Sequence, residues 1–219
     1  MTIVYLIRHS VKLSKKNLIN SKLEDKNLYD EKTSLSVIGE KRAEILSNKS
    51  IFDDIDIIYS SNMVRSIQTA KYLANRLNLN INVDERLNER RYGIANSEAY
   101  PDWFTRQYKY PDFKTVNGES QNDVFKRVYE CLNEILNKNE NKKIAIFSHG
   151  YAITFLLLKW CKLENINEER KLTLSYKNKI VMDKVINAPE VFKLTFDKNK
   201  IKSIELIEFD DLPFEHGGI

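Results

Sequence analysis

Two of the three histidines in this chain occur in the same local context. His9 follows an apolar run at residues 3–7, and His149 follows a second apolar run at residues 143–147. Both runs have the length and composition of buried strands, which places each imidazole at the carboxyl end of a strand. Ligands of open α/β sheets bind outside those ends. If the two strands are neighbours, both imidazoles therefore project into one crevice.

Two arginines are expected beside these histidines. Arg8 directly precedes His9, and Arg65 falls in the first turns of a helix that follows the strand-like residues 55–59. A guanidinium group binds phosphate oxygens in pairs and keeps its charge at any working pH. Neighbouring cations also favour the neutral, nucleophilic form of histidine. The four side chains predict a pocket in which a histidine attacks a bound phosphoryl group while the cations stabilise its oxygens.

Cleavage of a phosphate ester also needs an acid that protonates the leaving oxygen. Glu89 follows a third strand-like segment, residues 81–83, and is a candidate for that role. Taken alone it is one of many acidic residues. The sequence contains no CxxC or HExxH spacing, so neither a metal nor another cofactor is expected.

Strand-like and helix-like segments alternate along the chain, which predicts an α/β layered fold to hold these residues. Strands are expected at residues 3–7, 55–59, 81–83 and 143–147. Helices are expected after a cap at Ser36, around residues 64–77, after a capping box of Ser120 and Asp123, and over residues 151–161. Residues 191–196 and 201–209 indicate an antiparallel hairpin.

Residues 93–118 form a long segment without clear periodicity and with many aromatic side chains. Segments of this kind often form a lid over a binding site. Tyr92 and Trp103 are then the candidate contacts to a substrate. A cluster of aromatic rings packed beneath a loop explains the same composition, so both interpretations stay open.

The bulk composition fits one globular domain spanning residues 1–219, with 42% apolar and 30% charged residues. The formal net charge of +4 is too small to indicate a nucleic acid partner. No apolar stretch has the length of a membrane span, and no signal-peptide pattern is expected at the start. Cys131 and Cys161 are expected to be buried free thiols, as in a cytoplasmic protein. The oligomeric state stays open.

Taken in order, these segments resemble the motifs of the histidine phosphatase superfamily, the phosphoglycerate mutase-like group. Together they cover nearly the whole chain. The matching segments are residues 6–10 (LIRHS), 33–43 (TSLSVIGEKRA), 60–70 (SSNMVRSIQTA), 87–93 (LNERRYG), 118–120 (GES) and 148–150 (SHG).

The resemblance implies a three-layer α/β/α sandwich with a mainly parallel sheet, and a small phosphorylated substrate. It implies that His9 is the phosphorylated nucleophile and that Glu89 donates a proton to the leaving oxygen and later activates water. It also implies that Arg8, Arg65 and His149 bind the phosphate. No metal is needed for this chemistry.

The sequence differs from the family pattern in three respects. Ser10 replaces the glycine after the nucleophile and adds a hydroxyl that could contact the phosphate. The family's usual serine and asparagine fall near Lys12 and Lys15, and Lys12 could substitute as a point charge. The segment after residues 87–93 lacks the paired arginines that mutases use for bisphosphates, which favours hydrolysis over mutase chemistry.

Three functions therefore remain open from the sequence. The first is a metal-independent phosphomonoesterase with residues 93–118 as its lid. The second is a mutase, whose extra cations would have to come from Arg90, Arg91 or Arg106. The third is a catalytically silent protein that binds a phosphorylated ligand, a reading that the intact catalytic set disfavours.

Overall fold

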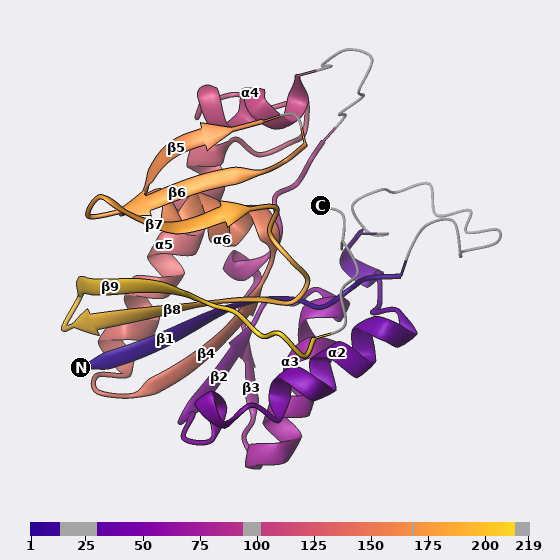
Figure 1. Ribbon diagram of the computed structural model, residues 1–219. Helices are drawn as coiled ribbons and strands as arrows, with labels where there is room; N and C mark the ends of the chain where they lie inside the picture. Colours follow the sequence, from indigo (N-terminus) through magenta and orange to yellow (C-terminus); the bar gives the residue numbers. More distant parts are fainter. Residues whose placement is uncertain (14–29, 94–101, 168, 213–219) are drawn as a thin grey trace.

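The computed structural model of this chain describes residues 1–13, 30–93, 102–167 and 169–212. Its centre is a six-stranded sheet (Figure 1). In chain order the strands are β1 (Thr2–Arg8), β2 (Ile57–Ser60), β3 (Ile81–Val83), β4 (Lys143–Ser148), β8 (Glu190–Asp197) and β9 (Lys200–Ile207). Across the sheet the order is β3-β2-β4-β1-β8-β9. The first four strands run parallel, and β8 and β9 are antiparallel to their neighbours.

The two central strands are buried on both faces. Successive side chains of a strand point to opposite sides of the sheet. In β1, Val4 and Leu6 therefore join one hydrophobic core, whereas Tyr5 and Ile7 join a second core on the other face. A sheet with two apolar faces requires a covering layer on each side.

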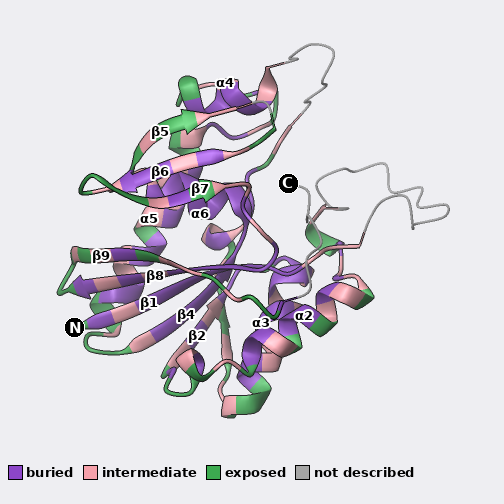
Figure 2. Ribbon diagram, in the orientation of Figure 1, coloured by how far each residue is buried: buried purple, intermediate pink, exposed green. Residues whose placement is uncertain are grey.

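Helices supply these layers on both faces. The helices α2 (Val37–Ser47) and α3 (Val64–Leu77) cover the core that contains Tyr5. The helices α5 (Gln121–Lys138) and α6 (Gly150–Leu157) cover the core that contains Val4. Figure 2 shows the buried residues gathered in the central strands and on the inward sides of the helices. The predicted three-layer α/β/α sandwich with a mainly parallel sheet is confirmed.

Local signals place the helix starts well. The hydroxyl of Ser36 accepts a hydrogen bond from the Gly39 N–H at 3.1 Å and caps α2. Ser120 and Asp123 form the predicted capping box at α5, because each side chain accepts a hydrogen bond from the other residue's main chain. The last helix is shorter than the predicted residues 151–161, because the chain turns after Leu157 to enter a further strand.

That strand belongs to a second sheet, which the sequence did not indicate. It consists of β5 (Lys162–Ile166), β6 (Leu172–Tyr176) and β7 (Lys179–Lys184), all antiparallel. The turn between β6 and β7 uses Lys177 and Asn178, with φ of 50° and 62°. Two successive residues in the left-handed region suit a tight hairpin. The turn contains no glycine, so it lacks the sequence pattern that usually predicts such a hairpin. Buried side chains of this sheet pack on the α5–α6 core.

The predicted hairpin at the end of the chain is present as β8 and β9. Cys131 and Cys161 are buried free thiols, as predicted. A short helix, α4 (Trp103–Lys109), and two single turns, η2 (Ser50–Phe52) and η3 (Glu85–Leu87), complete the described elements. Within the described ranges, no helix has both the length and the apolar character needed to cross a membrane. The single-domain assignment of residues 1–219 stays a prediction.

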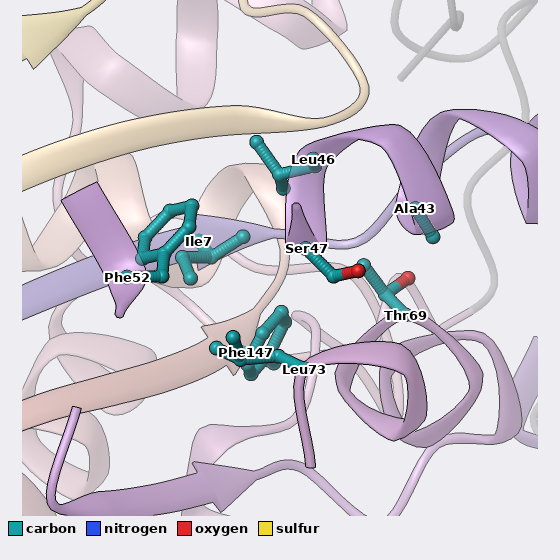
Figure 3. A pocket seen from close by; sticks show the side chains of 8 residues that line it. All are labelled: Ile7, Ala43, Leu46, Ser47, Phe52, Thr69, Leu73 and Phe147. Atoms are coloured by element: carbon teal, nitrogen blue, oxygen red, sulfur yellow. The ribbon is translucent and has the colours of Figure 1, made fainter. Parts of the chain in front are cut away.

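Packing between α2, α3 and the sheet supports the chain just after His9. A small pocket at this point is lined mainly by apolar side chains, among them Ile7, Phe147 and Leu73 (Figure 3). Thr69 is one of its two polar side chains. Its hydroxyl accepts a hydrogen bond from the Ser10 N–H at 3.0 Å and donates one to the main-chain oxygen of Arg65 at 2.7 Å. The core thereby fixes the main chain of two candidate site residues.

Candidate active site

The two predicted histidines meet at the carboxyl edge of the sheet. Arg8 pairs with Ser148 in the parallel register of β1 and β4, so the next residue of each strand emerges at the same level. The His9 N–H donates a hydrogen bond to the Ser148 main-chain oxygen at 2.9 Å. The centroids of the His9 and His149 rings lie 5.0 Å apart.

The hydrogen bonds of His9 define which nitrogen can react. Nδ1 lies 2.6 Å from the main-chain oxygen of Ser10. Because a carbonyl oxygen only accepts, this contact assigns the ring proton to Nδ1 and leaves the lone pair on Nε2. Nε2 accepts a hydrogen bond from Nε of Arg65 at 3.1 Å. Nε2 is therefore the nucleophilic atom of this side chain.

Burial and neighbouring cations keep both imidazoles neutral. Desolvation, followed by repulsion from Arg65 and Arg8, lowers the pKa of His9 well below its usual value of 6.5. Desolvation, followed by repulsion from Arg65 and His9, also lowers the pKa of His149 well below 6.5. A neutral imidazole has the lone pair that nucleophilic attack requires.

Arg65 lies in the first turn of α3 and has only 1% of its side chain exposed. Its Nη2 donates to Oδ2 of Asp30 at 3.2 Å and to Sδ of Met63 at 3.3 Å, and its Nη1 donates to the Asp30 main-chain oxygen. Nζ of Lys12 lies 3.8 Å from Oδ1 of the same Asp30. Asp30 was missed by the sequence reasoning, because it lies in the polar residues 11–32, which have no periodicity.

Arg8 is held by main-chain oxygens of a distant segment. Its Nη1 donates to the main-chain oxygens of Ile186 at 2.7 Å and Asn187 at 3.1 Å, in the connection that leads into β8. A Cβ atom placed on Gly150 would lie 3.6 Å from Nε of Arg8 and 3.8 Å from Oε2 of Glu89. The guanidinium group and this carboxylate therefore both border the first residue of α6.

At the site, the buried polar atoms Nδ1 of His149 and Oγ of Ser10 have no hydrogen-bond partner among the described residues. Nε2 of His149 is engaged, 2.7 Å from the hydroxyl of Ser61. If that hydroxyl donates, Nδ1 carries the proton and can donate it to an anion. Buried polar groups are normally paired, so both atoms are suited to ligand oxygens. Ser61 was also missed, although its place directly after β2 was an available signal.

The carboxylate of Glu89 lies against the N-terminus of α6. Oε1 accepts hydrogen bonds from the N–H groups of Arg90 at 2.9 Å and Ala152 at 3.2 Å, and Oε2 accepts one from Tyr151 at 3.3 Å. The N-terminal end of a helix favours a negative group. These three donors fix the direction in which the carboxylate faces the pocket.

Arg127 of α5 holds the main chain on which Glu89 lies. Its Nη1 donates to the oxygens of Arg86 and Asn88, both at 2.8 Å, and its Nη2 donates to the oxygen of Glu89 at 3.1 Å. The same guanidinium group forms a two-pronged pair with Glu119, at 2.8 and 2.9 Å. One part-buried ion pair therefore clamps the loop that carries the candidate acid.

Comparison with known families decides the assignment of the chain. The model of the histidine phosphatase superfamily (branch 1) matches residues 4–178. The chain belongs to the histidine phosphatase superfamily.

Relatives within this superfamily carry more than one activity in their names. Phosphoserine phosphatase 1 of Hydrogenobacter thermophilus is 30% identical over 123 residues, which are 52% of this chain and 58% of that protein. The putative phosphoserine phosphatase 2 of the same organism is 26% identical over 205 residues, 81% of this chain and 95% of that protein. A probable phosphoglycerate mutase GpmB of Yersinia pestis is 28% identical over 163 residues, 70% and 72% of the two chains.

Solved structures of histidine phosphatases share the fold. YhfR of Bacillus stearothermophilus superposes with a TM-score of 0.66 at 18% identity and covers 100% of both chains. A mycobacterial glucosyl-3-phosphoglycerate phosphatase superposes with a TM-score of 0.63 at 19% identity, covering 93% of this chain and 96% of that one. At these identities the likeness concerns the fold alone.

Two of the positions that depart from the family pattern, Ser10 and Lys12, lie beside candidate site residues. Ser10 is buried next to His9, and its hydroxyl, like Nδ1 of His149, has no hydrogen-bond partner among the described residues. Lys12 lies beside Asp30, with 40% of its side chain exposed. Lys15 falls outside the described residues. Within the described part of the chain, no group of three or more His, Cys, Asp and Glu side chains is arranged to hold a metal ion.

The described part of the suggested lid packs as an aromatic cluster. The ring centroids of Tyr92 and Trp103 lie 5.9 Å apart, and both rings contact Tyr151 of α6. The guanidinium carbon of Arg90 lies 4.5 Å from the Trp103 ring centroid, and its nitrogens donate to Gln107 and to main-chain oxygens. Residues 94–101 fall outside the described chain, so the lid assignment stays a proposal.

The depressed pKa of His9 can be measured directly. The imidazole should stay neutral in the folded protein as the pH falls through 6.5, because protonation would add a third buried cation beside Arg8 and Arg65. Nitrogen chemical shifts of the histidine side chains, assigned with a His9→Asn variant, report this titration. In urea the same imidazole should titrate near 6.5, so acidification below that value should lower the free energy of unfolding. A folded-state pKa at or above 6.5 contradicts this picture.

The Arg127 clamp gives a second prediction. Arg127→Lys keeps a positive charge beside Glu119 but removes the planar fork that holds three main-chain oxygens. Turnover of an alkyl phosphate should fall about tenfold to a hundredfold, because the acid is displaced from its productive position. Binding of inorganic phosphate should be unchanged. Arg76→Lys, at a surface pair with Asp53, is the matched control. Equal activities of the two variants would exclude a positioning role for the clamp.

Proposed function

We propose that this protein hydrolyses phosphomonoesters of small molecules and that His9 carries the phosphoryl group as a covalent intermediate. The observation that supports this most directly is the bonding of the His9 ring. Its Nδ1 donates to the main-chain oxygen of Ser10, which leaves the lone pair on Nε2, beside Arg65. A neutral nucleophile in contact with a fixed cation suits attack on a phosphoryl group.

The reaction proceeds in two displacements at phosphorus. In the first, Nε2 of His9 forms a bond to phosphorus while the ester P–O bond breaks, and protonated Glu89 gives its proton to the leaving oxygen. In the second, water attacks the phosphohistidine and Glu89 accepts the proton of that water. The N–P bond breaks, inorganic phosphate is released, and His9 returns to its neutral form.

Four side chains around His9 would hold the three non-bridging phosphate oxygens. Arg8 and Arg65 supply fixed charges, and the Nδ1–H of His149 and the hydroxyl of Ser10 supply hydrogen bonds. The last two atoms are buried without a described partner, which a phosphate oxygen would correct. Lys12, at the more exposed side of the pocket, would add a point charge.

The arginines near the acid favour hydrolysis over mutase chemistry. A mutase of this kind needs extra cations for a second phosphate group. Arg90 is buried and directed at Gln107 and main-chain oxygens, Arg91 has a carboxylate of Glu119 at 3.8 Å, and Arg106 binds Asp102 at 3.0 Å. All three candidate cations therefore have partners within the chain.

The names of relatives and the aromatic cluster around Tyr151 support a substrate class. Two relatives are named as phosphoserine phosphatases, and one structural neighbour as a glucosyl-3-phosphoglycerate phosphatase. We propose a small phosphorylated hydroxy acid or hydroxy amino acid, covered by the suggested lid at residues 93–118 and contacted by Trp103 of the lid and by the adjacent Tyr92. The silent-binder alternative requires no turnover, which the first experiment below decides.

Replacing the nucleophile should abolish turnover. His9→Ala should lower the rate of hydrolysis of an aryl phosphate by about 10⁴-fold or more, because the covalent route is lost. The measurement compares hydrolysis by both proteins with a metal chelator present. It also follows transfer of radiolabelled phosphate to the protein after an alkaline quench, because phosphohistidine is stable in base and labile in acid. Wild type should retain activity in chelator and carry label, whereas the variant should do neither. Full activity in His9→Ala would contradict the phosphohistidine route.

The role of Glu89 is separable from that of His9 by the choice of leaving group. Glu89→Gln should slow hydrolysis of alkyl phosphates about 10²-fold or more, because their leaving oxygen needs a proton. Aryl phosphates, with a stable leaving phenolate, should lose much less in the first step. Pre-steady-state release of the alcohol isolates that step. If both substrates lose the same factor, Glu89 is not the acid.

A further inference from the structure

Asp30 places a negative charge beside Arg65 and Lys12, the two cations that bind phosphate in the proposed reaction. Its Oδ2 lies 3.2 Å from Nη2 of Arg65, and its Oδ1 lies 3.8 Å from Nζ of Lys12. Its main-chain oxygen also accepts a hydrogen bond from Nη1 of Arg65. Neither displacement at phosphorus uses this carboxylate.

The pair has a clear physical reason. Arg65 is almost fully buried, and its other described contacts, with Nε2 of His9 and Sδ of Met63, carry no formal charge. An isolated buried cation is costly, and a carboxylate matches the guanidinium fork as a phosphate does. Asp30 therefore neutralises Arg65 through one carboxylate oxygen on Nη2, a donor that a phosphate oxygen would also use.

A phosphate dianion and this carboxylate compete for the same donors. If the phosphate and the Asp30 carboxylate both lay against Arg65 and Lys12, their negative charges would repel each other. Simultaneous binding is therefore disfavoured. The Asp30 side chain is 23% exposed, so its carboxylate can turn toward water without crossing the protein interior. Lys12, with 40% of its side chain exposed, can follow either partner.

We propose that Asp30 is an affinity-setting residue of this site, whose carboxylate must leave Arg65 and Lys12 before a phosphate group can bind there. The proposal rests on the assignment of those two cations to phosphate. The apparent affinity for phosphate is then reduced by the fraction of molecules in which Asp30 holds the cations. The same competition acts on inorganic phosphate after each turnover, so it weakens product inhibition.

The test replaces only the charge. Asp30→Asn preserves the shape of the side chain and the main-chain oxygen that contacts Arg65. Glu31→Gln, an exposed neighbour, makes the same change in net charge and serves as the matched control. Calorimetric titration with inorganic phosphate at pH 8 should give a dissociation constant about tenfold lower for Asp30→Asn than for wild type. The control should match wild type.

Thermal melting distinguishes competition from a purely structural pair. Without phosphate, Asp30→Asn should melt below wild type, because Arg65 loses its counter-charge. Saturating phosphate should raise its melting temperature by more than it raises that of wild type. A structural pair would lower the melting temperature and weaken phosphate binding together. Asp30→Ser, which also removes the charge, repeats both measurements if the asparagine variant does not fold.

The outcomes separate the two proposals. If wild type binds phosphate and both Asp30 variants bind it equally well or more weakly, the proposed role of Asp30 is overturned. The phosphatase proposal then stays intact. The absence of phosphate binding in wild type and variants alike contradicts the assignment of the phosphate pocket itself, and the role of Asp30 falls with it. Tighter binding in the Asp30 variants, with an unaltered Glu31→Gln control, supports the role.

Discussion

The parallel pairing of β1 with β4 is the constraint on which the site depends. Both strands are central and buried on both faces, so core packing fixes their register and the level at which they end. Their next residues, His9 and His149, are thereby held with ring centroids 5.0 Å apart. The neighbouring strand β2 leads directly to Ser61 and then to Arg65 on α3. Sites built on rigid elements hold their geometry without depending on loop order.

This arrangement concentrates positive charge where water is scarce, and the surroundings offset that charge in three ways. Main-chain oxygens of the connection before β8 hold Arg8. Both imidazoles stay neutral, because burial and the arginines depress their pKa values. Asp30 lies against Arg65. Preorganised cations that need little reorganisation are the main requirement for stabilising a phosphoryl group in transfer. On the proposals above, a phosphorylated substrate has to compete with one carboxylate and does not have to assemble the pocket.

Sequence reasoning reached the residues whose position is set by local pattern. The positions of a histidine directly after an apolar run and of an arginine at a helix start can be predicted from the sequence, because strand ends and helix caps are local features. The roles of Asp30 and Arg127 could not be predicted in this way, since each contacts residues that are distant in the sequence. The sheet formed by β5, β6 and β7 was missed for a related reason. Its strands are short, its turn at Lys177 and Asn178 lacks glycine, and only packing on α5 and α6 defines its apolar side.

The candidate acid Glu89 lies on a loop, whereas the candidate nucleophile His9 follows a strand. Helix α6 connects their positions. Glu89 lies on a loop, which is a poor support for a catalytic group unless other contacts fix it. Here the carboxylate accepts hydrogen bonds from N–H groups at the start of α6, and its main chain is tied to α5 through Arg127. Since α6 begins at the residue after His149, the strand that aligns the two histidines also sets the position of the carboxylate. The end of β4 therefore fixes both the proposed phosphate pocket and the carboxylate of the candidate acid.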